Sequence, residues 1–224
     1  MNTPYPSRWP ELLSAASAII DQANLRGIGM TDWTFGGGTA LMLQINHRES
    51  HDIDIFVSDP QYLAYLNPVL QGYDIELEPT DYEGDGASSL KLVFDGIGEV
   101  DFICCTSLTN NPFAITDVLG TPVRLETPAE ILAKKIYFRG KRLQPRDIYD
   151  IAAVAASEHS EESVRQLSAY GDACTDALQV IDKMNHDFVR DIMKRLLAHE
   201  GFRDLHMEAK GIAADFLQKC LDHK

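Results

Sequence analysis

Long apolar runs are absent from the 224-residue sequence, and we expect no N-terminal leader. Nowhere do about 18 apolar residues follow one another, which is the length that a membrane-spanning helix needs. The first twenty residues contain no basic stretch that leads into an apolar run and a small-residue cleavage site. We therefore expect a cytoplasmic protein that has no membrane partner.

The four cysteines lack the short paired spacing of a zinc knuckle or a thioredoxin-like motif. Cys104 and Cys105 are adjacent inside an apolar segment, where cysteine usually serves as a small core side chain. Free thiols agree with a reducing compartment. Internal repeats and low-complexity stretches are also absent, which indicates one large globular domain or two modest ones.

Basic residues are scarce in the first half of the chain. Residues 1–125 contain 17 acidic and 5 basic residues, a net charge of -12, whereas residues 126–224 contain 17 and 15, a net charge of -2. The total of -14 argues against a nucleic-acid partner, because phosphate backbones are held mainly by Lys and Arg. However, six of the basic residues fall between Lys134 and Arg146. An acidic half and one local basic cluster together suit a site for metal and phosphate.

Apolar periodicity and glycine-rich turns predict a mixed α/β unit in the first half. The spacing of apolar residues predicts helices, and alternation predicts strands. The expected helices cover residues 9–24, 39–46 and 60–70, and the expected strands cover residues 33–35, 52–57, 74–78, 89–94 and 99–105.

Beyond Thr127 the pattern changes to helices with few glycines. Thr127-Pro128-Ala129-Glu130 is a typical helix start, with threonine as the cap, proline at the first position and glutamate in the capping-box place. The expected helices cover residues 128–138, 146–156, 161–169, 172–184, 187–198 and 205–221. We predict an α+β fold with an α/β core over residues 1–126 and a helical domain over residues 127–224.

The segment FGGGTALMLQINHRESHDIDIF, residues 35–56, carries the clearest functional signal. Glycines between a strand and a helix let the backbone turn sharply, and the amide N–H groups at a helix start stabilise an anion. A phosphate is therefore expected at Gly36, Gly37, Gly38 and Thr39.

Three aspartates are candidate metal ligands. Alternation over residues 52–57 places Asp52 and Asp54 on one face of a strand, and hard divalent cations prefer such oxygen ligands. Asp101 lies among apolar residues of a later strand, where a carboxylate is costly to bury unless it is paired or binds metal. If the two strands are neighbours, the three carboxylates converge and suffice for two cations. His47 and His51, in contrast, are expected to face solvent or to form hydrogen bonds rather than to bind metal.

The order of these features resembles the nucleotidyltransferase fold of the DNA polymerase beta type. Thirteen residues separate the glycine turn, which ends at Gly38, from Asp-Ile-Asp, and a further aspartate lies on a later strand. The sequence pattern GGTAL, HR, S and DIDIF resembles the AbiEii/AbiGii toxin nucleotidyltransferase family still more closely. The resemblance implies a polymerase-beta-like mixed sheet flanked by helices and followed by a helical bundle. It also suggests that Arg48 and Ser50, which match the family's sequence pattern, order the loop or contact the nucleotide.

A second motif of that family is matched by EILAKKIYFRGKRLQPRDIYD, residues 130–150. It places Lys135 at the family's lysine position and ends on Arg146, Asp147 and Asp150. Lys135, Arg139 and Arg142 fall at helical spacing and so form one stripe. The stripe either faces triphosphate or RNA, or is simply a solvated helix face. We expect an ion pair between Arg146 and Asp147, and two readings of Asp147 and Asp150 stay open, a catalytic role and a purely structural one.

The resemblance implies an enzyme that passes a nucleotidyl group from a nucleoside triphosphate (NTP) to an acceptor, with Mg²⁺ or Mn²⁺. Asp52 and Asp54 would bind both metals, and Asp101 would bind one and accept the acceptor's proton. Lys135 would offset charge on the triphosphate. The acceptor would be RNA, with a tRNA 3′ end as one option, and the enzyme would be the toxin of a toxin–antitoxin or phage-defence pair.

Two alternatives stay open at this point. One is a nucleotidyltransferase that acts on a protein or a small molecule, which the acidic composition favours. The other is a nucleotide-binding interaction module without turnover, although such a chain need not retain three acids.

Overall fold

The computed structural model describes residues 6–223. Residues 1–5, part of the stretch expected to carry no leader, and Lys224 lie outside the described residues. The chain divides into two compact units. Unit 1 runs up to Ala40 and also comprises Ser50–Thr106 and Ala114–Leu125, whereas unit 2 comprises Leu41–Glu49, Ser107–Phe113 and the chain from Glu126 onward.

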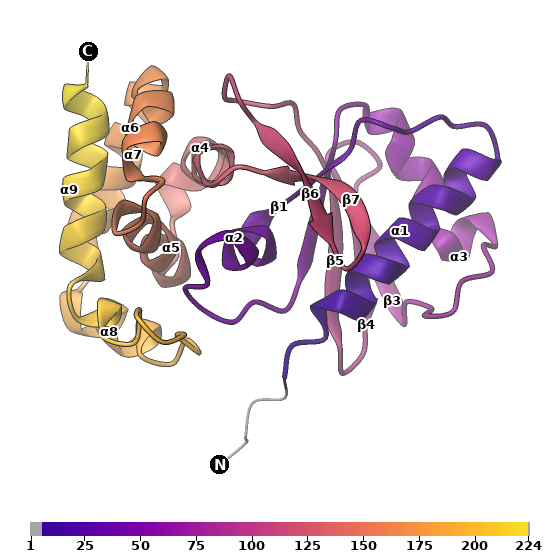
Figure 1. The fold of residues 1–224 in the computed structure, drawn as a ribbon, viewed down its shortest axis with the longest axis horizontal. Helices are drawn as coiled ribbons and strands as arrows, with labels where there is room; N and C mark the ends of the chain where they lie inside the picture. The colour runs from indigo at the N-terminus through magenta and orange to yellow at the C-terminus, as the bar shows by residue number, and fades with distance from the viewer. Residues whose placement is uncertain (1–5, 224) are drawn as a thin grey trace. The chain divides into compact units, whose positions relative to one another are not determined.

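Unit 1 is built on a mixed seven-stranded sheet in the order β3-β4-β5-β2-β1-β7-β6 (Figure 1). At its centre β2 runs antiparallel to β1 and parallel to β5, while β1 also pairs in parallel with β7. The strands are β1 (Thr34–Gly36), β2 (Ile53–Val57), β3 (Asp81–Gly84), β4 (Ser89–Phe94), β5 (Gly98–Cys104), β6 (Phe113–Val118) and β7 (Thr121–Glu126). With the helices described below, the sheet confirms the predicted α+β class.

Alternation along β2 explains how the sheet is covered. Ile53, Ile55 and Val57 are buried, whereas Asp54 and Phe56 on the other face are partly exposed, as predicted. Helix α1 (Trp9–Leu25) packs against β2 and β5 and buries an apolar stripe that spans its length. Burial of such a stripe is what holds a helix on a sheet.

Several predicted elements of unit 1 were wrong in type or missed. Residues 74–78 form no strand, and the predicted helix over residues 60–70 is a 3-10 helix, η1 (Pro60–Tyr65), followed by one turn, α3 (Pro68–Gln71). Asn67 caps α3 and breaks the expected single helix. Strands β3, β6 and β7 were not predicted. β3 is exposed throughout and β6 buries only its last residue, so neither has the buried apolar face that makes a strand recognisable.

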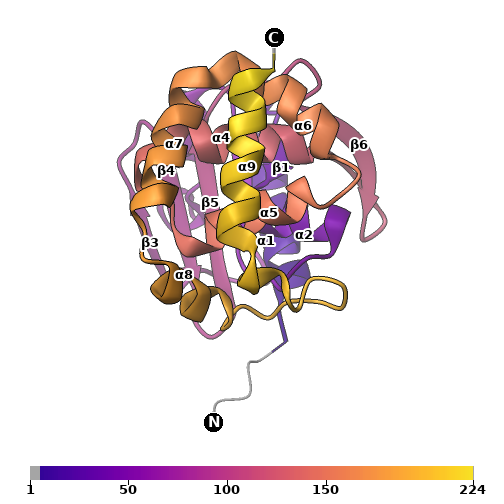
Figure 2. The same cartoon turned by 90° about the vertical axis from the view of Figure 1, so that its left-hand side faces the viewer.

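Unit 2 is a helical bundle in which α9 packs against α5 and α7 (Figure 2). Six helices were predicted in this part of the chain, each close to one observed here. The helices are α4 (Pro128–Arg139), α5 (Pro145–Ala155), α6 (Ser160–Leu167), α7 (Gly171–Lys183), α8 (His186–Met193) and α9 (Ala209–Asp222), with 3-10 turns η2 (Gly140–Arg142), η3 (Ser168–Tyr170) and η4 (Leu205–Met207). Helix α2 (Gly37–Ile45) starts in unit 1 and continues into unit 2.

Two inner segments join unit 2, although the boundary predicted after residue 126 assigns them to the first domain. Glu130 explains why the segment Ser107–Phe113 belongs to unit 2. Its carboxylate accepts the backbone N–H groups of Leu108 and Thr109, at 2.9 and 2.8 Å for the shortest bonds. Thr127 caps α4 as expected, but Glu130 bonds residues 107–113 to the helix instead of completing a capping box.

Within residues 6–223, no helix is long and apolar enough to cross a membrane.

Candidate active site

The glycine turn places the start of α2 directly against a carboxylate of β2. Gly37 adopts a φ of +70°, which a residue with a Cβ atom rarely adopts. A Cβ atom at Gly37 would lie 1.8 Å from Asp54 Oδ2 and 2.4 Å from Asp54 Cγ. Only glycine therefore lets the backbone approach Asp54 this closely. The first N–H groups of a helix have no partner within the helix, so a negatively charged ligand is favoured at this end.

The neighbouring predicted residues frame this turn. Gly36 is the last residue of β1 and pairs with Asp54 across the sheet. Gly38 lies in the first turn of α2 and is partly exposed. Thr39 is fully buried and its hydroxyl donates to the backbone carbonyl of Asp52 at 2.5 Å. The Thr39 side chain thus fastens α2 to the start of β2, and a direct phosphate contact stays a prediction.

The structure brings the three predicted aspartates to one region of the sheet. Asp54 and Asp101 are direct register partners on the parallel strands β2 and β5. Asp52 lies immediately before β2, and its Oδ1 accepts the backbone N–H of Glu99 at 3.1 Å. All three side chains are partly exposed. Ser50 is buried in the preceding loop, where its carbonyl accepts the hydroxyl of Ser7 at 2.6 Å.

The electrostatics of Asp101 show that negative charge is crowded here. Burial raises the pKa of Asp101 to about 6, and the charge of Asp54 adds to this rise. Lys91 opposes it from β4, where it is the register partner of Asp101, with Nζ 3.6 Å from Asp101 Oδ2. Lys91 also pairs with Glu99. The cationic charge of Lys91 is therefore shared among several carboxylates.

Lys91 and Glu99 were not predicted as part of the site. A signal for them exists in the sequence, because β4 and β5 form a hairpin around the Gly96 turn. Pairing Phe94 with Gly98 at the turn automatically brings Lys91 opposite Asp101. Among residues 6–223, no three Asp, Glu, His or Cys side chains are arranged as a ready-made metal cage.

Arg48 and His47, in contrast, belong to unit 2 and contact Asp150 on α5. Arg48 makes a bidentate pair with Asp150, at 2.7 Å from Nε to Oδ1 and 2.9 Å from the second guanidinium nitrogen to Oδ2. His47 Nε2 lies 2.9 Å from Asp150 Oδ1, and its ring is fully buried beside Tyr149 and Phe202. His47 was expected to face solvent or to form hydrogen bonds, and it forms a hydrogen bond with Asp150. The guanidinium of Arg48 is thus paired with Asp150, and its predicted nucleotide contact stays a prediction.

Lys135 and Asp147 complete this group of side chains. Lys135 Nζ lies 2.9 Å from Asp147 Oδ1 and 3.1 Å from Asp150 Oδ2. Both carboxylates are fully buried. We call His47, Arg48, Lys135, Asp147 and Asp150 the Asp150 network. It balances two carboxylates with one ammonium and one guanidinium.

Two expectations about the basic segment change with these contacts. Asp147 pairs with Lys135 rather than with Arg146, which forms no ion pair with any of residues 6–223. Arg139 is half exposed, with its guanidinium 3.9 Å from Asp147. The predicted stripe is not one helix face, because α4 ends at Arg139 and Arg142 lies on η2. Lys134, the residue before Lys135, is also buried and pairs with Glu126 at 2.5 Å.

The pKa values of the network follow from the balance of burial and opposite charge. Burial opposes ionisation of Asp150, but Arg48 and Lys135 outweigh it and hold the pKa of Asp150 well below its ordinary value. Burial likewise opposes ionisation of Asp147, and Lys135 again lowers its pKa. Burial lowers the pKa of His47, which keeps the ring neutral. Both aspartates are therefore ionised in the folded state and His47 is not.

The stability of unit 2 is expected to fall as pH is lowered. An unfolded chain binds a proton on histidine below about pH 6.5 and on aspartate below about pH 3.9, before the folded His47, Asp147 and Asp150 do. The unfolded state thus gains protons first, and the free energy of unfolding decreases below about pH 6.5 and more steeply below about pH 4. Urea midpoints from far-UV circular dichroism across this range measure the effect. His47→Gln should remove the upper step and keep the lower one, and a midpoint that stays constant throughout would contradict the assignment.

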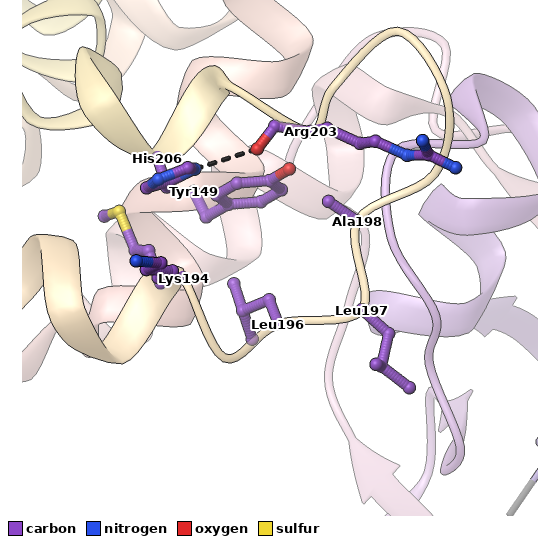
Figure 3. A pocket seen from close by; sticks show the side chains of 8 residues that line it. Tyr149, Lys194, Leu196, Leu197, Ala198, Arg203 and His206 are labelled. Atoms are coloured by element: carbon purple, nitrogen blue, oxygen red, sulfur yellow. Dashed lines mark hydrogen bonds between the residues drawn. The ribbon is translucent and has the colours of Figure 1, made fainter. Parts of the chain in front are cut away.

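A separate pocket of about 300 Å³ lies within unit 2 (Figure 3). Tyr149 of α5, the end of α8 and the following loop line it, and His206 Nδ1 hydrogen-bonds the carbonyl of Arg203 at 2.8 Å. None of the predicted site residues lines this pocket. The three predicted metal ligands lie on the sheet of unit 1 instead.

Comparison with known proteins agrees with the geometry. No curated protein sequence matches the chain significantly. The nucleotidyltransferase toxin MenT4 from Mycobacterium tuberculosis has a similar structure, with a TM-score of 0.54, 16% identity, and coverage of 94% of this chain and 85% of MenT4. JHP933 from Helicobacter pylori gives a TM-score of 0.51 and 16% identity over 97% of this chain and 96% of its own.

These two structural likenesses concern the fold alone, whereas a family model identifies the chain. The model described as "Nucleotidyl transferase AbiEii toxin, Type IV TA system" matches residues 22–217. The match includes the glycine turn, the three aspartates and the whole Asp150 network. The chain therefore belongs to the AbiEii family of nucleotidyltransferase toxins from type IV toxin–antitoxin systems.

Proposed function

We propose that this enzyme transfers a nucleotidyl group from an NTP to a hydroxyl group of RNA, with a tRNA 3′ end as the first acceptor to test. The acceptor oxygen forms a bond to the α-phosphorus of the NTP, the bond to the β-phosphate breaks, and pyrophosphate leaves. The glycine turn, Gly36 to Gly38, would receive the triphosphate at the start of α2. The observation that carries the proposal is the close approach of Gly37 to Asp54. It would set the turn that receives phosphate beside a carboxylate that binds metal.

The residues present fit a divalent cation. Asp54 and Asp101 are neighbours across β2 and β5, and the raised pKa of Asp101 reflects burial together with the negative charge of Asp54. Oxygen-rich sites of this kind suit Mg²⁺ or Mn²⁺. Bound at Asp52, Asp54 and Asp101, the metal would supply charge neutralisation for the phosphates and lower the pKa of the acceptor hydroxyl. Asp101 would in addition accept the proton of that hydroxyl.

Lys135 and Asp147, which were predicted to be catalytic, have a structural role in the proposal. Lys135 already bonds two buried carboxylates, so we assign it and Asp147 to the organisation of unit 2. Arg48 has the same role through Asp150. Contacts of Arg139, half exposed, with the nucleotide remain a proposal.

The cellular role that we propose follows the family. A toxin that modifies RNA would arrest growth until a cognate antitoxin relieves it, and such pairs would serve phage defence. The four cysteines are free thiols, which supports the cytoplasm as the place of action.

The proposal is tested by incubating the purified protein with each α-labelled NTP, Mg²⁺ and total cellular RNA. Label in a tRNA-sized band with the wild type, but not with an Asp52→Ala, Asp54→Ala double variant, is the expected result and identifies the nucleotide. Absence of label on RNA with a folded wild-type protein would overturn the RNA acceptor.

A protein or small-molecule acceptor is the second candidate, and the net charge of -14 favours it. Label on protein or on a small molecule in the same reactions would establish it. Nucleotide binding without pyrophosphate release, unaffected by Asp101→Asn, would instead indicate an interaction module without turnover.

Gly37→Ala is expected to lower nucleotidyl transfer by about 10²-fold or more. A methyl group 1.8 Å from Asp54 Oδ2 must displace the carboxylate, and a misplacement of about 1 Å in an active site costs on this order. Initial rates at saturating NTP measure the loss.

Gly96→Ala is the matched control for Gly37→Ala. Gly96 has the same φ of +70°, but a Cβ atom there would meet nothing within 4 Å. Both variants carry the backbone strain, so only Gly37→Ala should lose activity. Equal losses in the two variants would attribute the effect to strain rather than to the Asp54 contact.

A further inference from the structure

Exposed aromatic and basic side chains gather where α4 ends. Tyr137 and Phe138 are each 53% exposed, although rings of this size are usually more buried. Arg139, Lys141 and Arg142 follow them directly and are exposed. With Tyr170 of η3 we call this set the α4 corner; its members are Tyr137, Phe138, Arg139, Lys141, Arg142 and Tyr170. All of them belong to unit 2.

The rings of the α4 corner form a contiguous cluster. Tyr137 meets Phe138 edge-to-face at a centroid distance of 5.0 Å and meets Tyr170 at 5.7 Å. Tyr170 is itself held by a hydrogen bond from its hydroxyl to the carbonyl of Leu108. Clustered rings that stay exposed in a folded unit indicate a surface that a partner covers.

The backbone that carries these side chains is packed tightly. Gly140 is buried against α7, where a Cβ atom would lie 3.0 Å from the carbonyl oxygen of Ala173. Leu143 is buried three residues later. The exposed residues between and before them are thus presented from a fixed turn, which lowers the ordering cost of binding a ligand.

Charge at the α4 corner is opposite to that of the chain as a whole. Arg142 forms no ion pair with any of residues 6–223, and Lys141, 79% exposed, has a single solvent-screened contact of 3.5 Å with Asp176. Within the described part of the chain, the one ion pair of Arg139 is with Asp147, at 3.9 Å. Cations are therefore in local excess on a chain of net charge -14, and polyanions are attracted to such a patch.

We propose that the α4 corner binds single-stranded RNA, with bases stacked on the rings of Tyr137 and Phe138 and phosphates held by Lys141 and Arg142. Exposed rings beside cations are how proteins bind unpaired nucleotides without sequence preference. A protein partner would match the rings equally well, but the excess of cations favours phosphates. The inference rests on the proposed function, because it supplies the surface on which an RNA acceptor is held.

Fluorescence anisotropy of a labelled oligouridine, titrated with the full chain, tests the α4 corner. Tyr137→Ala and Phe138→Ala should each weaken binding about 5- to 150-fold, the range for loss of one stacked base. Phe188→Ala, which removes a ring 60% exposed on α8, is the matched control and should leave binding unchanged. Equal effects of the three variants would overturn the proposal.

Salt dependence tests the phosphate contacts separately. Arg142→Gln should reduce the slope of log affinity against log salt by about 0.7, the value for one phosphate contact on a single strand. Arg195→Gln, which removes another exposed arginine of unit 2, should leave the slope unchanged. Wild-type binding that is absent or independent of salt would overturn the proposal and point to a protein partner.

Parallel transfer assays separate this inference from the proposed function. Oligouridine binding should persist in Asp54→Asn, because Asp54 lies in unit 1 and outside the α4 corner. Binding that depends on the corner, with no transfer to any RNA by the wild type, would support the corner and overturn the RNA acceptor. Transfer to RNA that Tyr137→Ala and Phe138→Ala leave unchanged, with no effect on binding, would overturn the corner alone.

Discussion

Asp54→Asn is expected to abolish nucleotidyl transfer, with a loss of at least about 10³-fold. The amide keeps the size of the side chain but removes the charge with which Asp54, beside Asp101, would bind the cation. Metal-assisted charge stabilisation contributes several kcal/mol, and each 1.4 kcal/mol changes a rate about tenfold. Single-turnover rates of pyrophosphate release, with total cellular RNA present as the source of acceptor, measure the loss.

Asp95→Asn, an exposed acid in the turn between β4 and β5, is the matched control for the loss of one negative charge. It should retain full activity. A readout besides activity is available, since NTP with Mg²⁺ at 100 times its dissociation constant stabilises a protein by about 2.7 kcal/mol. This thermal shift should disappear in Asp54→Asn. Wild-type rates in a well-folded Asp54→Asn protein would remove Asp54 from the active site.

In the metal-free protein the same substitution has a second expected effect. Asp54 contributes to the raised pKa of Asp101, after burial. Asp54→Asn should therefore lower the pKa of Asp101 from about 6 toward its ordinary range, and burial should keep it above that range. Carboxyl chemical shifts followed by NMR over pH test whether the two side chains interact as the register of β2 and β5 implies.

The sheet around the site was largely predictable because its strands obey simple patterns. The alternation of β2 places its aspartate on the face opposite its buried apolar residues, and the glycines mark where β1 must end. Strands at the rim of the sheet were not predictable in this way. β3 is exposed at every position, so nothing in its sequence distinguishes an edge strand from a loop.

The contact that defines the candidate site was only half predictable. Sequence spacing placed Gly37 near the start of a helix and Asp54 in a strand, but not the closeness of one to the other. That closeness depends on the antiparallel pairing of β1 with β2, in which Gly36 lies opposite Asp54. Pairing partners are chosen by the packing of the whole sheet, and one residue of slip would move Asp54 to the opposite face.

The Asp150 network was the least predictable part. Asp150 binds Arg48 and His47, which lie about a hundred positions earlier in the chain. The second motif identified Lys135 and Asp147 as special residues, but their contact with each other shows only in three dimensions. Buried opposite charges within one domain satisfy each other, so a motif of charged residues alone does not distinguish a ligand-binding group from an internal ion pair.

Asp150→Ala is expected to destabilise unit 2 by about 3–5 kcal/mol, because removal of one partner leaves buried charges uncompensated. Asp150 is fully buried, and its loss removes the carboxylate that Arg48 and Lys135 share. Both tryptophans, Trp9 and Trp33, lie in unit 1, so their fluorescence does not report on unit 2. Urea unfolding followed by far-UV circular dichroism, which is dominated by the helices, measures the change.

Asp215→Ala, which removes an exposed acid of α9, is the control and should change stability by less than about 0.5 kcal/mol. A double-mutant cycle then locates the cause. Asp150→Ala should cost less in an Arg48→Met background than in the wild type, because that background no longer buries the guanidinium. Equal costs in both backgrounds would mean that Asp150 stabilises the unit by packing and not by its charge. In that case the pH dependence of stability that we assign to Asp150 should also be absent. The two measurements therefore test one electrostatic assignment independently, one by removing its partner and one by protonation.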